Sequence, residues 1–262
     1  MRSPFAATLA PLLFALAACT SAAPAPIELT VLGAASLKGA LEAAEAAYEA
    51  AVPGTTLTFS TDSSSALRTQ IEQGARADVF LSADSTNPQK LVDAGLAAGD
   101  PVPFAGNALT IIVPTDNPAG IASPADLASA GVKIVAAGDE VPITKYADQL
   151  VGNLAGLDGY PADFAARCAA NVVSREDNVK AVVAKIELGE GDAGIVYVTD
   201  AKASTRVETI GVPDEANVLV TYAGVVVKAS EHAEAARTFL DWFAGPQGQA
   251  ILAEFGFLPV PS

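Results

Sequence analysis

Short apolar runs alternate with helix-like segments along the chain after residue 26, and this alternation constrains the fold more than any other feature. The runs are about as long as a typical strand, and most are followed by apolar residues at helical spacing. The expected strands are 27–32, 56–60, 77–82, 109–113, 132–136, 194–198 and 207–211. The expected helices lie near 37–51, 66–73, 88–94, 124–130, 142–154, 178–188, 231–243 and 246–255. This pattern predicts an α/β fold with helices on both faces of each sheet.

Two long apolar segments suggest that the chain forms two lobes rather than one large domain. The segments 106–113 and 218–227 form a matched pair, and each is long enough to cross from one lobe to the other. We therefore expect one lobe to contain 27–106 and 224–262, and the other to contain 107–223. A cleft between two lobes is a common place for a small ligand.

Hydroxyl side chains occur where two of the expected strands turn into helices. Ser36 follows the run 27–32 at the start of a helical pattern, so it reads as a helix N-cap. A run of three serines, 63–65, stands in the same place after the strand 56–60. Helix starts expose unpaired N–H groups and a partial positive charge, so two of them facing one cleft could hold a small anion. The alternative is that these serines act only as helix caps.

The first residues have the character of an export signal. Arg2 is followed by an apolar stretch from Phe5 to Ala15, which is too short to span a membrane as a mature helix. The sequence Leu16-Ala17-Ala18-Cys19 then resembles a bacterial lipoprotein lipobox. The resemblance implies a signal peptide over 1–18, lipidation of Cys19 and a flexible tether over 19–26. We expect the mature chain to be anchored by its lipid outside the cytoplasm, although an unlipidated secreted protein is the alternative.

The charge balance excludes several classes of partner. The sequence has 15 basic and 30 acidic residues, and cleavage before Cys19 would remove only Arg2, leaving a net charge of about −16. Nucleic acids and anionic lipid surfaces are bound through cationic patches, so neither is an expected partner. An anion would also be repelled at long range, so an anion site here must act through dipoles at contact distance. We expect a monomer.

Cysteine and histidine offer little chemistry. With Cys19 assigned to lipidation, Cys168 has no partner for an intramolecular disulfide and reads as a small buried helical residue. His232 is the only histidine, and no cysteine stands at metal-ligand spacing from it. We therefore expect no transition-metal site of the Cys/His kind and no protein ligand bonded directly to a metal.

An ordered set of segments resembles the molybdate-binding component of bacterial ABC transporters. The set comprises 27–32 with Ala34 to Leu37, Phe59 with 63–65, 77–80, Gly106-Asn107, Val141-Pro142, 177–179, 194–197 with Asp200, and Gly245-Pro246-Gln247. It covers essentially the whole mature chain in order. The resemblance implies a two-lobed type II periplasmic-binding fold, no enzymatic activity and no cofactor, with molybdate or tungstate as the ligand. It also implies a permease and its ATPase as partners.

The resemblance further implies five positions that hold the oxyanion. Ser36 and, within the serine run, Ser64 would supply hydroxyls, Ile143 and Val179 backbone amides, and Tyr197 a phenol hydroxyl. The chain departs from the family where Ile143-Thr144-Lys145 follows Val141-Pro142, which introduces a possible cation. It also has Asn178 where an acidic residue is usual.

These donor types suit an anion that is fully ionised at neutral pH. Hydroxyls and amides donate hydrogen bonds without losing their protons, and a site made only of donors rejects a protonated oxyanion such as hydrogenphosphate. Sulfate has the same shape and charge as molybdate and must be excluded by size. Tungstate cannot be distinguished from molybdate in this way.

Three alternatives remain. One is a binding protein for sulfate, another oxyanion or a small organic acid. A secreted serine hydrolase is less favoured, because the Gly-x-Ser-x-Gly motif is absent and the lone His232 makes a serine triad improbable. A purely adhesive surface protein would show no response to a ligand.

Overall fold

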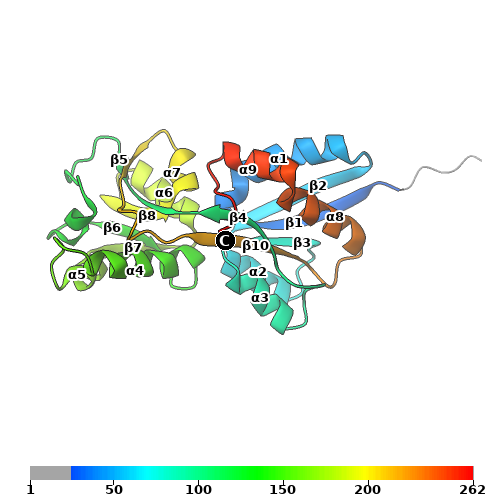
Figure 1. Cartoon of the computed structure of the whole chain (residues 1–262), viewed down its shortest axis with the longest axis horizontal. Helices are drawn as coiled ribbons and strands as arrows, with labels where there is room; N and C mark the ends of the chain where they lie inside the picture. Colours follow the sequence, from blue (N-terminus) through cyan, green and yellow to red (C-terminus); the bar gives the residue numbers. More distant parts are fainter. Residues whose placement is uncertain (1–24, 262) are drawn as a thin grey trace, which may run out of the picture.

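The computed structural model describes residues 25–261, which form two lobes that each contain one five-stranded sheet (Figure 1). The expected signal peptide over 1–18, the lipidation at Cys19 and the first part of the tether lie outside the described residues. Within the described range, no helix is both long and apolar enough to cross a membrane. The two-lobed α/β architecture expected from the alternation is present.

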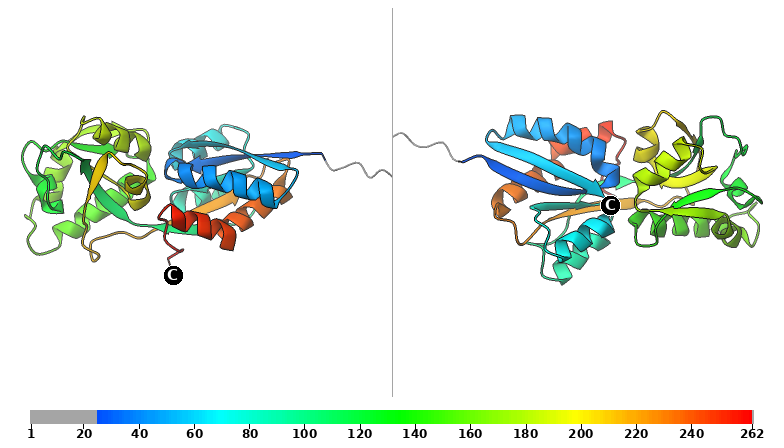
Figure 2. Two further views of the ribbon diagram at one scale, coloured as in Figure 1. Left: turned by 90° about the horizontal axis from the view of Figure 1, so that it is seen from above. Right: turned by 180° about the vertical axis from the view of Figure 1, so that it is seen from behind.

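Lobe I is built on a sheet with the strand order β2-β1-β3-β10-β4. Its strands are β1 (Ile27–Ala34), β2 (Thr55–Asp62), β3 (Val79–Ser82), β4 (Val102–Asn107) and β10 (Val220–Val226). The first three are mutually parallel, with Ala34 opposite Asp62 and Gly33 opposite Leu81, whereas β10 runs antiparallel to β3 and β4. The carboxyl ends of β1, β2 and β3 point toward the other lobe (Figure 2).

Helices cover both faces of the lobe I sheet because its strands are apolar on both sides. The helices are α1 (Lys38–Ala51), α8 (Ala233–Ala244) and α9 (Pro246–Glu254) on one face, and α2 (Ser64–Glu72) and α3 (Thr86–Asp93) on the other (Figure 1). Along β3, Val79 and Leu81 belong to the core under α1 and α8, while Phe80 belongs to the smaller core under α2 and α3. This is the two-residue alternation of a strand buried on both faces.

Lobe II repeats the arrangement with the strand order β7-β6-β8-β5-β9. Its strands are β5 (Leu109–Pro114), β6 (Ile134–Ala137), β7 (Val172–Glu176), β8 (Ala193–Tyr197) and β9 (Val207–Ile210). Its helices are η2 (Pro124–Ala128), α4 (Pro142–Ala155), α5 (Phe164–Ala170), α6 (Val179–Glu187) and α7 (Val198–Lys202). Strand β6 runs parallel to both β7 and β8. Their carboxyl ends lead directly into α4, α6 and α7, at the side that faces lobe I.

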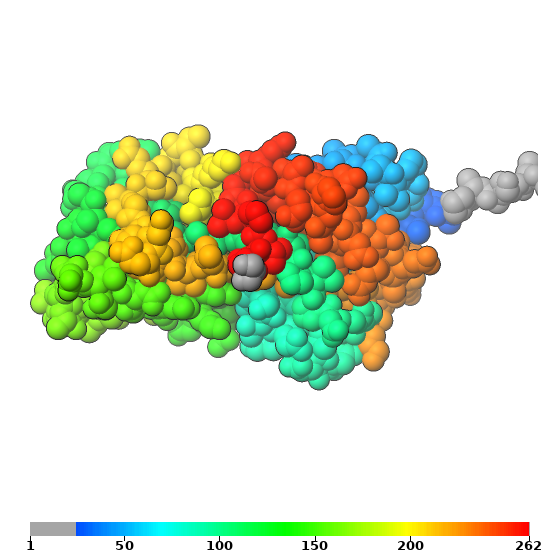
Figure 3. Space-filling model, viewed as in Figure 1, coloured from blue at the N-terminus to red at the C-terminus, as the bar shows by residue number. Residues whose placement is uncertain are grey.

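The chain crosses between the lobes twice. The first crossing is at Ala108, because β4 ends at Asn107 in one sheet and β5 begins at Leu109 in the other. The second precedes Val220, which already pairs with Asn107 in the lobe I sheet. The expected boundary between residues 223 and 224 is therefore a few residues too late, because all of β10 belongs to lobe I. In the space-filling view the lobes meet along a continuous seam (Figure 3).

The C-terminal segment is fixed against the first crossing. The Leu258 backbone exchanges two hydrogen bonds with Gly106, with N–O distances of 2.6 and 2.8 Å. A Cβ atom on Gly106 would lie 2.4 Å from the Pro259 carbonyl oxygen, so only glycine fits there. Phe257 packs edge-on against Tyr222 of β10, with ring centres 5.3 Å apart. Residues 257–258 thus hold β4 and β10 together next to the first crossing.

Several short elements differ from the expected ones. Strand β7 and helix α7 were not expected, and the helix expected at 124–130 is the short 3-10 helix η2. The buried helical position expected for Cys168 is confirmed, because Cys168 lies on α5. Helix α2 begins at Ser64 rather than at 66. Strand β7 alternates partly buried and exposed residues at the edge of its sheet, so it lacks the buried apolar run that marks the central strands.

Candidate functional site

A small cavity lies between the two lobes where the carboxyl ends of the parallel strands converge. It is lined by Ala34, Ala35, Ser36, Asp62, Ser63, Ser64 and Ala83 from lobe I, and by Val141, Pro142, Ile143, Asn178, Val179 and Tyr197 from lobe II. All five residues expected to hold an oxyanion are in this set. The cavity volume is about 10 Å³, close to the room that one water-sized solute needs. Such a space favours a compact ion over an extended organic molecule.

Neighbouring serines of the run 63–65 make different hydrogen bonds. Ser63 is the N-cap of α2, and its hydroxyl accepts a hydrogen bond from the Ala66 amide at 3.3 Å. Ser64 is the first residue of the helix, and its Oγ accepts a hydrogen bond from the Ala83 amide at 3.0 Å. Because that bond uses a lone pair of the Ser64 oxygen, its proton remains available to a ligand.

Ser36 is not the helix N-cap that the sequence indicated. It lies inside the 3-10 turn η1 (Ala35–Leu37), where no side chain caps the helix. Helix α1 then begins at Lys38, with Leu37 as its N-cap residue. The Ser36 Oγ instead lies 2.9 Å from the hydroxyl oxygen of Tyr222, which comes from β10. The tight turn keeps Ser36 at the cavity while freeing its hydroxyl from capping.

Two helix starts in lobe II lie at the cavity. Ile143 is the second residue of α4, after Val141-Pro142, and proline at the first position has no N–H to satisfy. Val179 is the first residue of α6, whose N-cap Asn178 accepts from the Ala181 amide at 3.1 Å. First-turn amides lack acceptors within their own helix, so those of Ile143 and Val179 can serve a ligand. Their side chains pack into lobe II, and both residues are almost fully buried.

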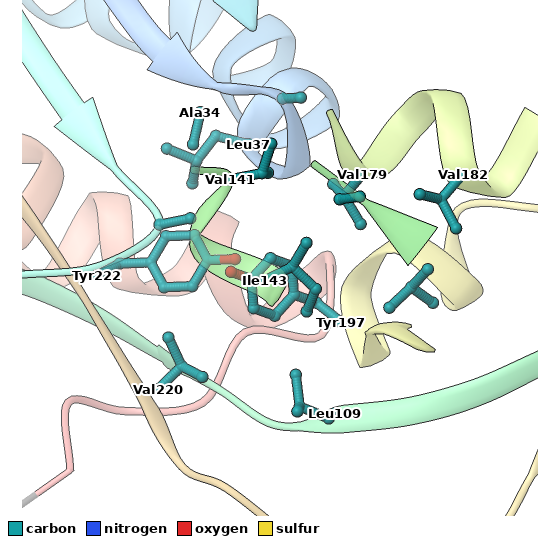
Figure 4. Close-up of a cluster of buried hydrophobic side chains, with 14 of the residues drawn as sticks. Ala34, Leu37, Leu109, Val141, Ile143, Val179, Val182, Tyr197, Val220 and Tyr222 are labelled. Atoms are coloured by element: carbon teal, nitrogen blue, oxygen red, sulfur yellow. The ribbon is translucent and has the colours of Figure 1, made fainter. Parts of the chain in front are cut away.

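Tyr197 supplies a hydroxyl that has no partner. The residue ends β8, is 1% exposed, and its oxygen has no hydrogen-bond partner among the described residues. Burial, followed by nearby groups such as Tyr222 and Asp200, raises the pKa of Tyr197 well above its usual range, so it stays protonated. In Figure 4 the hydroxyls of Tyr197 and Tyr222 both point into the space beside Ile143. A buried donor without an acceptor is unfavourable, and an anion in the cavity would satisfy it.

Two residues behind Ser36 were not identified from the sequence as parts of the site. Tyr222 is fully buried and lies 186 positions from Ser36, inside an apolar strand that gives no sign of a polar role. Asn107 Nδ2 donates to Tyr222 at 3.3 Å and to Thr199 Oγ1 at 2.9 Å. The pair Gly106-Asn107 contributed to the family resemblance, but nothing in the sequence connects it with Ser36.

One hydrogen bond joins the lobes at the edge of the cavity. Asn178 Nδ2 donates to Asp62 Oδ1 at 3.0 Å, and the same oxygen accepts from the Ser63 amide at 2.7 Å. Asp62 ends β2, and Asn178 precedes α6, so the bond links the two helix starts that carry Ser64 and Val179. Asn178, which the sequence analysis singled out, therefore supplies a donor toward Asp62.

The open cleft next to the cavity is acidic. It has a volume of about 780 Å³ and is lined by five carboxylates, Asp62, Asp139, Glu140, Glu176 and Asp177. Its two arginines are already paired, Arg175 with Asp139 at 3.1 Å, and Arg68 with Glu72 and with Asn87 Oδ1. Lys145 is exposed on α4 and does not line the cavity.

The donor set is therefore neutral. None of the residues that line the cavity is lysine, arginine or histidine. Among the described residues, no cluster of His, Cys, Asp and Glu has the geometry of a metal site. The arrangement offers hydroxyls and amides from both lobes to one small acceptor-rich ion.

Comparisons with known proteins agree with this architecture. Residues 29–258 match the family model described as bacterial extracellular solute-binding protein. The molybdate-binding protein ModA of Mycobacterium tuberculosis H37Rv is 35% identical over 92% of this chain and 92% of its own length.

Solved structures show the same fold. The substrate-binding domain of a putative molybdenum ABC transporter from Clostridium difficile is 30% identical, with a TM-score of 0.67 over 90% of this chain and all of that one. The sulfate-binding protein SubI of M. tuberculosis H37Rv has a TM-score of 0.77 at 21% identity, over 88% of this chain and 86% of that one. At that identity the likeness concerns the fold alone. With its two lobes, the converging strand ends and a family match over nearly all described residues, this chain belongs to the bacterial extracellular solute-binding proteins.

Proposed function

We propose that this protein captures molybdate or tungstate outside the cytoplasm and delivers it to an ABC permease driven by an ATPase. The observation that carries the proposal is the buried Tyr197 hydroxyl, which lies without a partner in a cavity lined by further hydroxyls and free helix-start amides. The sequence relative that binds molybdate and the solved molybdenum-transporter domain support the choice of ion.

The chemistry of the donors supports a fully ionised tetrahedral dianion. Ser36, Ser64 and Tyr197 would donate through hydroxyls, and Ile143 and Val179 through amides. Hydrogen bonds to a charged acceptor each contribute about 1.5–3 kcal/mol, so several together can offset the cost of removing the ion from water. The absence of a cation from the lining means that this stabilisation comes from dipoles.

A hydrolase is a poor fit to the same site. Ser36 has the hydroxyl of Tyr222 as its neighbour rather than a general base, and Lys38 is paired with Glu42. His232 lines a different surface region in lobe I. Binding without chemistry also agrees with the solute-binding family.

We infer that the mature chain is attached to the membrane by lipid at Cys19 and acts as a monomer. The lipobox-like sequence Leu16-Ala17-Ala18-Cys19 supports the attachment. Replacing Cys19 by serine in the producing cell should release the protein from the membrane fraction. Continued recovery of Cys19→Ser with the membrane would contradict lipidation at that residue.

The proposed ligand is tested first by thermal shift and titration calorimetry with molybdate, tungstate, sulfate, phosphate and chromate. At 100 times its Kd, a ligand stabilises the fold by about 2.7 kcal/mol, which moves the melting temperature by several degrees. We expect molybdate and tungstate to give the largest shifts. A larger shift with sulfate would make this a sulfate-binding protein, and no shift with any tetrahedral oxyanion would contradict the proposal.

The proposed ligand residues are tested by the double variant Ser36→Ala/Ser64→Ala. It should lose at least a hundredfold in molybdate affinity, because two charge-assisted hydrogen bonds are removed. Ser63→Ala is the matched control, since Ser63 also lines the cavity but its oxygen caps the helix, and the Ser65 hydroxyl 3.4 Å away is a neighbour for its own proton. That control should lose about 1 kcal/mol of stability and less than threefold in affinity. Unchanged molybdate binding by the double variant would refute the assignment.

A further inference from the structure

We infer that Tyr222, held by Asn107, fixes the Ser36 hydroxyl as a donor toward the cavity and thereby makes the site selective against protonated oxyanions. This inference rests on the proposed oxyanion-binding function and identifies a residue that controls its specificity. Tyr222 does not line the cavity itself, so it acts as a positioning residue through Ser36.

The direction of the hydrogen bonds is set at the Asn107 end. Asn107 Oδ1 accepts from the Ala108 amide at 3.0 Å, and a backbone N–H can only donate. The amide orientation is therefore determined, and Nδ2 must face Thr199 Oγ1 and the Tyr222 hydroxyl at 2.9 and 3.3 Å. Because Nδ2 donates, the Tyr222 oxygen accepts.

The Tyr222 hydroxyl must then donate its hydrogen bond to Ser36. Tyr222 is fully buried, and within the described part of the chain the hydrogen-bond partners of its oxygen are Asn107 Nδ2 and Ser36 Oγ. With Asn107 as the donor, Ser36 Oγ at 2.9 Å is the acceptor for the phenol proton. A buried hydroxyl that left its proton unpaired would cost about 1–3 kcal/mol.

Ser36 is left with its own proton, and that proton faces the cavity. Its oxygen accepts from Tyr222, and no other polar partner of the Ser36 side chain occurs among residues 25–261. Ser64 reaches the same state by a different route, because the backbone amide of Ala83 donates to its oxygen. Each serine oxygen therefore accepts one hydrogen bond from the protein, and its own O–H group is left to donate toward the cavity.

In this state the two serines offer no acceptor for a proton on the ligand, and the Asp62 carboxylate at the cavity edge already accepts at Oδ1 from Asn178 and from the Ser63 amide. The other proposed ligand groups are the amides of Ile143 and Val179 and the Tyr197 hydroxyl, and these act as donors toward an anion. Hydrogenphosphate and sulfate have the same charge and a similar shape, but hydrogenphosphate brings a proton that would meet a donor. Removing the Tyr222 hydroxyl would free Ser36 to rotate and accept that proton.

Tyr222→Phe tests the inference with little change in packing. The Tyr222 ring lies edge-on to Phe104, Tyr197 and Phe257, with ring centres 6.1, 5.7 and 5.3 Å away, and phenylalanine retains these contacts. Asn107 Nδ2 also retains Thr199 as an acceptor. Tyr48→Phe is the matched control, because Tyr48 is a buried lobe I tyrosine that packs on Phe239 and Trp242, away from Ser36.

The decisive measurement is a double-mutant cycle on molybdate affinity by titration calorimetry. Tyr222→Phe should weaken binding about tenfold when Ser36 is present and less than twofold in the Ser36→Ala background. Tyr48→Phe should leave affinity unchanged in both. Equal losses in the two backgrounds would show a structural effect that does not pass through Ser36, and no loss in either would also overturn the inference.

A selectivity measurement provides a second readout that a loss of stability would not produce. At pH 8.5, where phosphate is hydrogenphosphate, sulfate and phosphate are compared by displacement of bound molybdate. Tyr222→Phe should narrow the preference for sulfate over hydrogenphosphate about tenfold, whereas an unchanged preference would contradict the inference. A wild-type protein that binds no tetrahedral oxyanion would instead refute the proposed function, so the two failures are distinguishable.

Discussion

At the scale of single residues, the Tyr197 hydroxyl is unfavourable in the ligand-free protein and should contribute directly to ligand affinity. Its hydroxyl is buried and has no partner among the described residues. Tyr197→Phe should therefore weaken molybdate binding about tenfold without lowering the melting temperature of the ligand-free protein, because no hydrogen bond is lost there. Calorimetry and thermal unfolding measure the two effects separately. A large fall in ligand-free stability with unchanged affinity would make Tyr197 a structural residue.

The same tyrosines determine how binding responds to pH. Burial raises the pKa of both Tyr197 and Tyr222 well above the usual value near 10, so both remain protonated donors throughout the neutral range. Serine hydroxyls and amides do not titrate there either. Molybdate affinity should change less than threefold between pH 6 and pH 9, measured by calorimetry in buffers of constant ionic strength. A steady fall across this range would indicate a titrating cation in the site, with Lys145 as the first residue to replace.

At the scale of elements, the helix starts are connected to one another by side chains as well as by the ligand. The Asp62–Asn178 hydrogen bond joins the end of β2 to the start of α6 across the cleft. Asn178→Asp keeps a good N-cap but places a second carboxylate against Asp62. Repulsion should favour the open state and weaken molybdate binding roughly tenfold, with a smaller effect at high salt.

The exchange of the two groups provides the control for that variant. In Asp62→Asn/Asn178→Asp, one amide again faces one carboxylate, so most of the affinity should return. Calorimetry at low and high salt compares the single and double variants. A double variant as weak as Asn178→Asp alone would show that the cap or the loop, rather than the bond across the cleft, determines the effect.

The sequence predicts the buried strands correctly but misses some short elements, because only burial leaves a clear apolar pattern. Strand β5 and the second half of β1 appear as apolar runs because their side chains are buried on both faces of the sheet. The edge strand β7 and the five-residue helix α7 lack a sustained pattern and were missed. A single strand was expected over 106–113, whereas β4 ends at Asn107 and β5 begins at Leu109, because burial continues on both sides of Ala108.

Prediction of the site was limited in a similar way. Ser36, Ser64 and Tyr197 lie at strand ends, where a sequence can place them, and the family resemblance separated them from other polar residues. Tyr222 could not be assigned to Ser36, because their contact depends on how β10 enters the sheet from a distant part of the chain. The capping role expected for Ser36 was wrong because a 3-10 turn precedes α1.

At the scale of the whole molecule, donors on both lobes imply a movement between open and closed states. Neither lobe alone supplies enough donors to satisfy a dianion. The described chain crosses between the lobes at Ala108 and before Val220, and a rotation about these two points would open the cleft by breaking the Asp62–Asn178 bond. Small-angle scattering should show a smaller radius of gyration with saturating molybdate than without it. Identical profiles would mean that the cavity is already closed before the ion arrives.

The acidic cleft beside the cavity also affects the speed of capture. An oxyanion that enters through this cleft meets five carboxylates, of which only Asp139 and Glu176 are ion-paired within residues 25–261, on a chain with a formal net charge of −15. Mobile ions screen such repulsion over about 8 Å at physiological ionic strength, but they have little effect on an ion already enclosed. Added salt should therefore accelerate association while leaving dissociation nearly unchanged, so this protein would collect its ion faster in saline surroundings than in dilute ones.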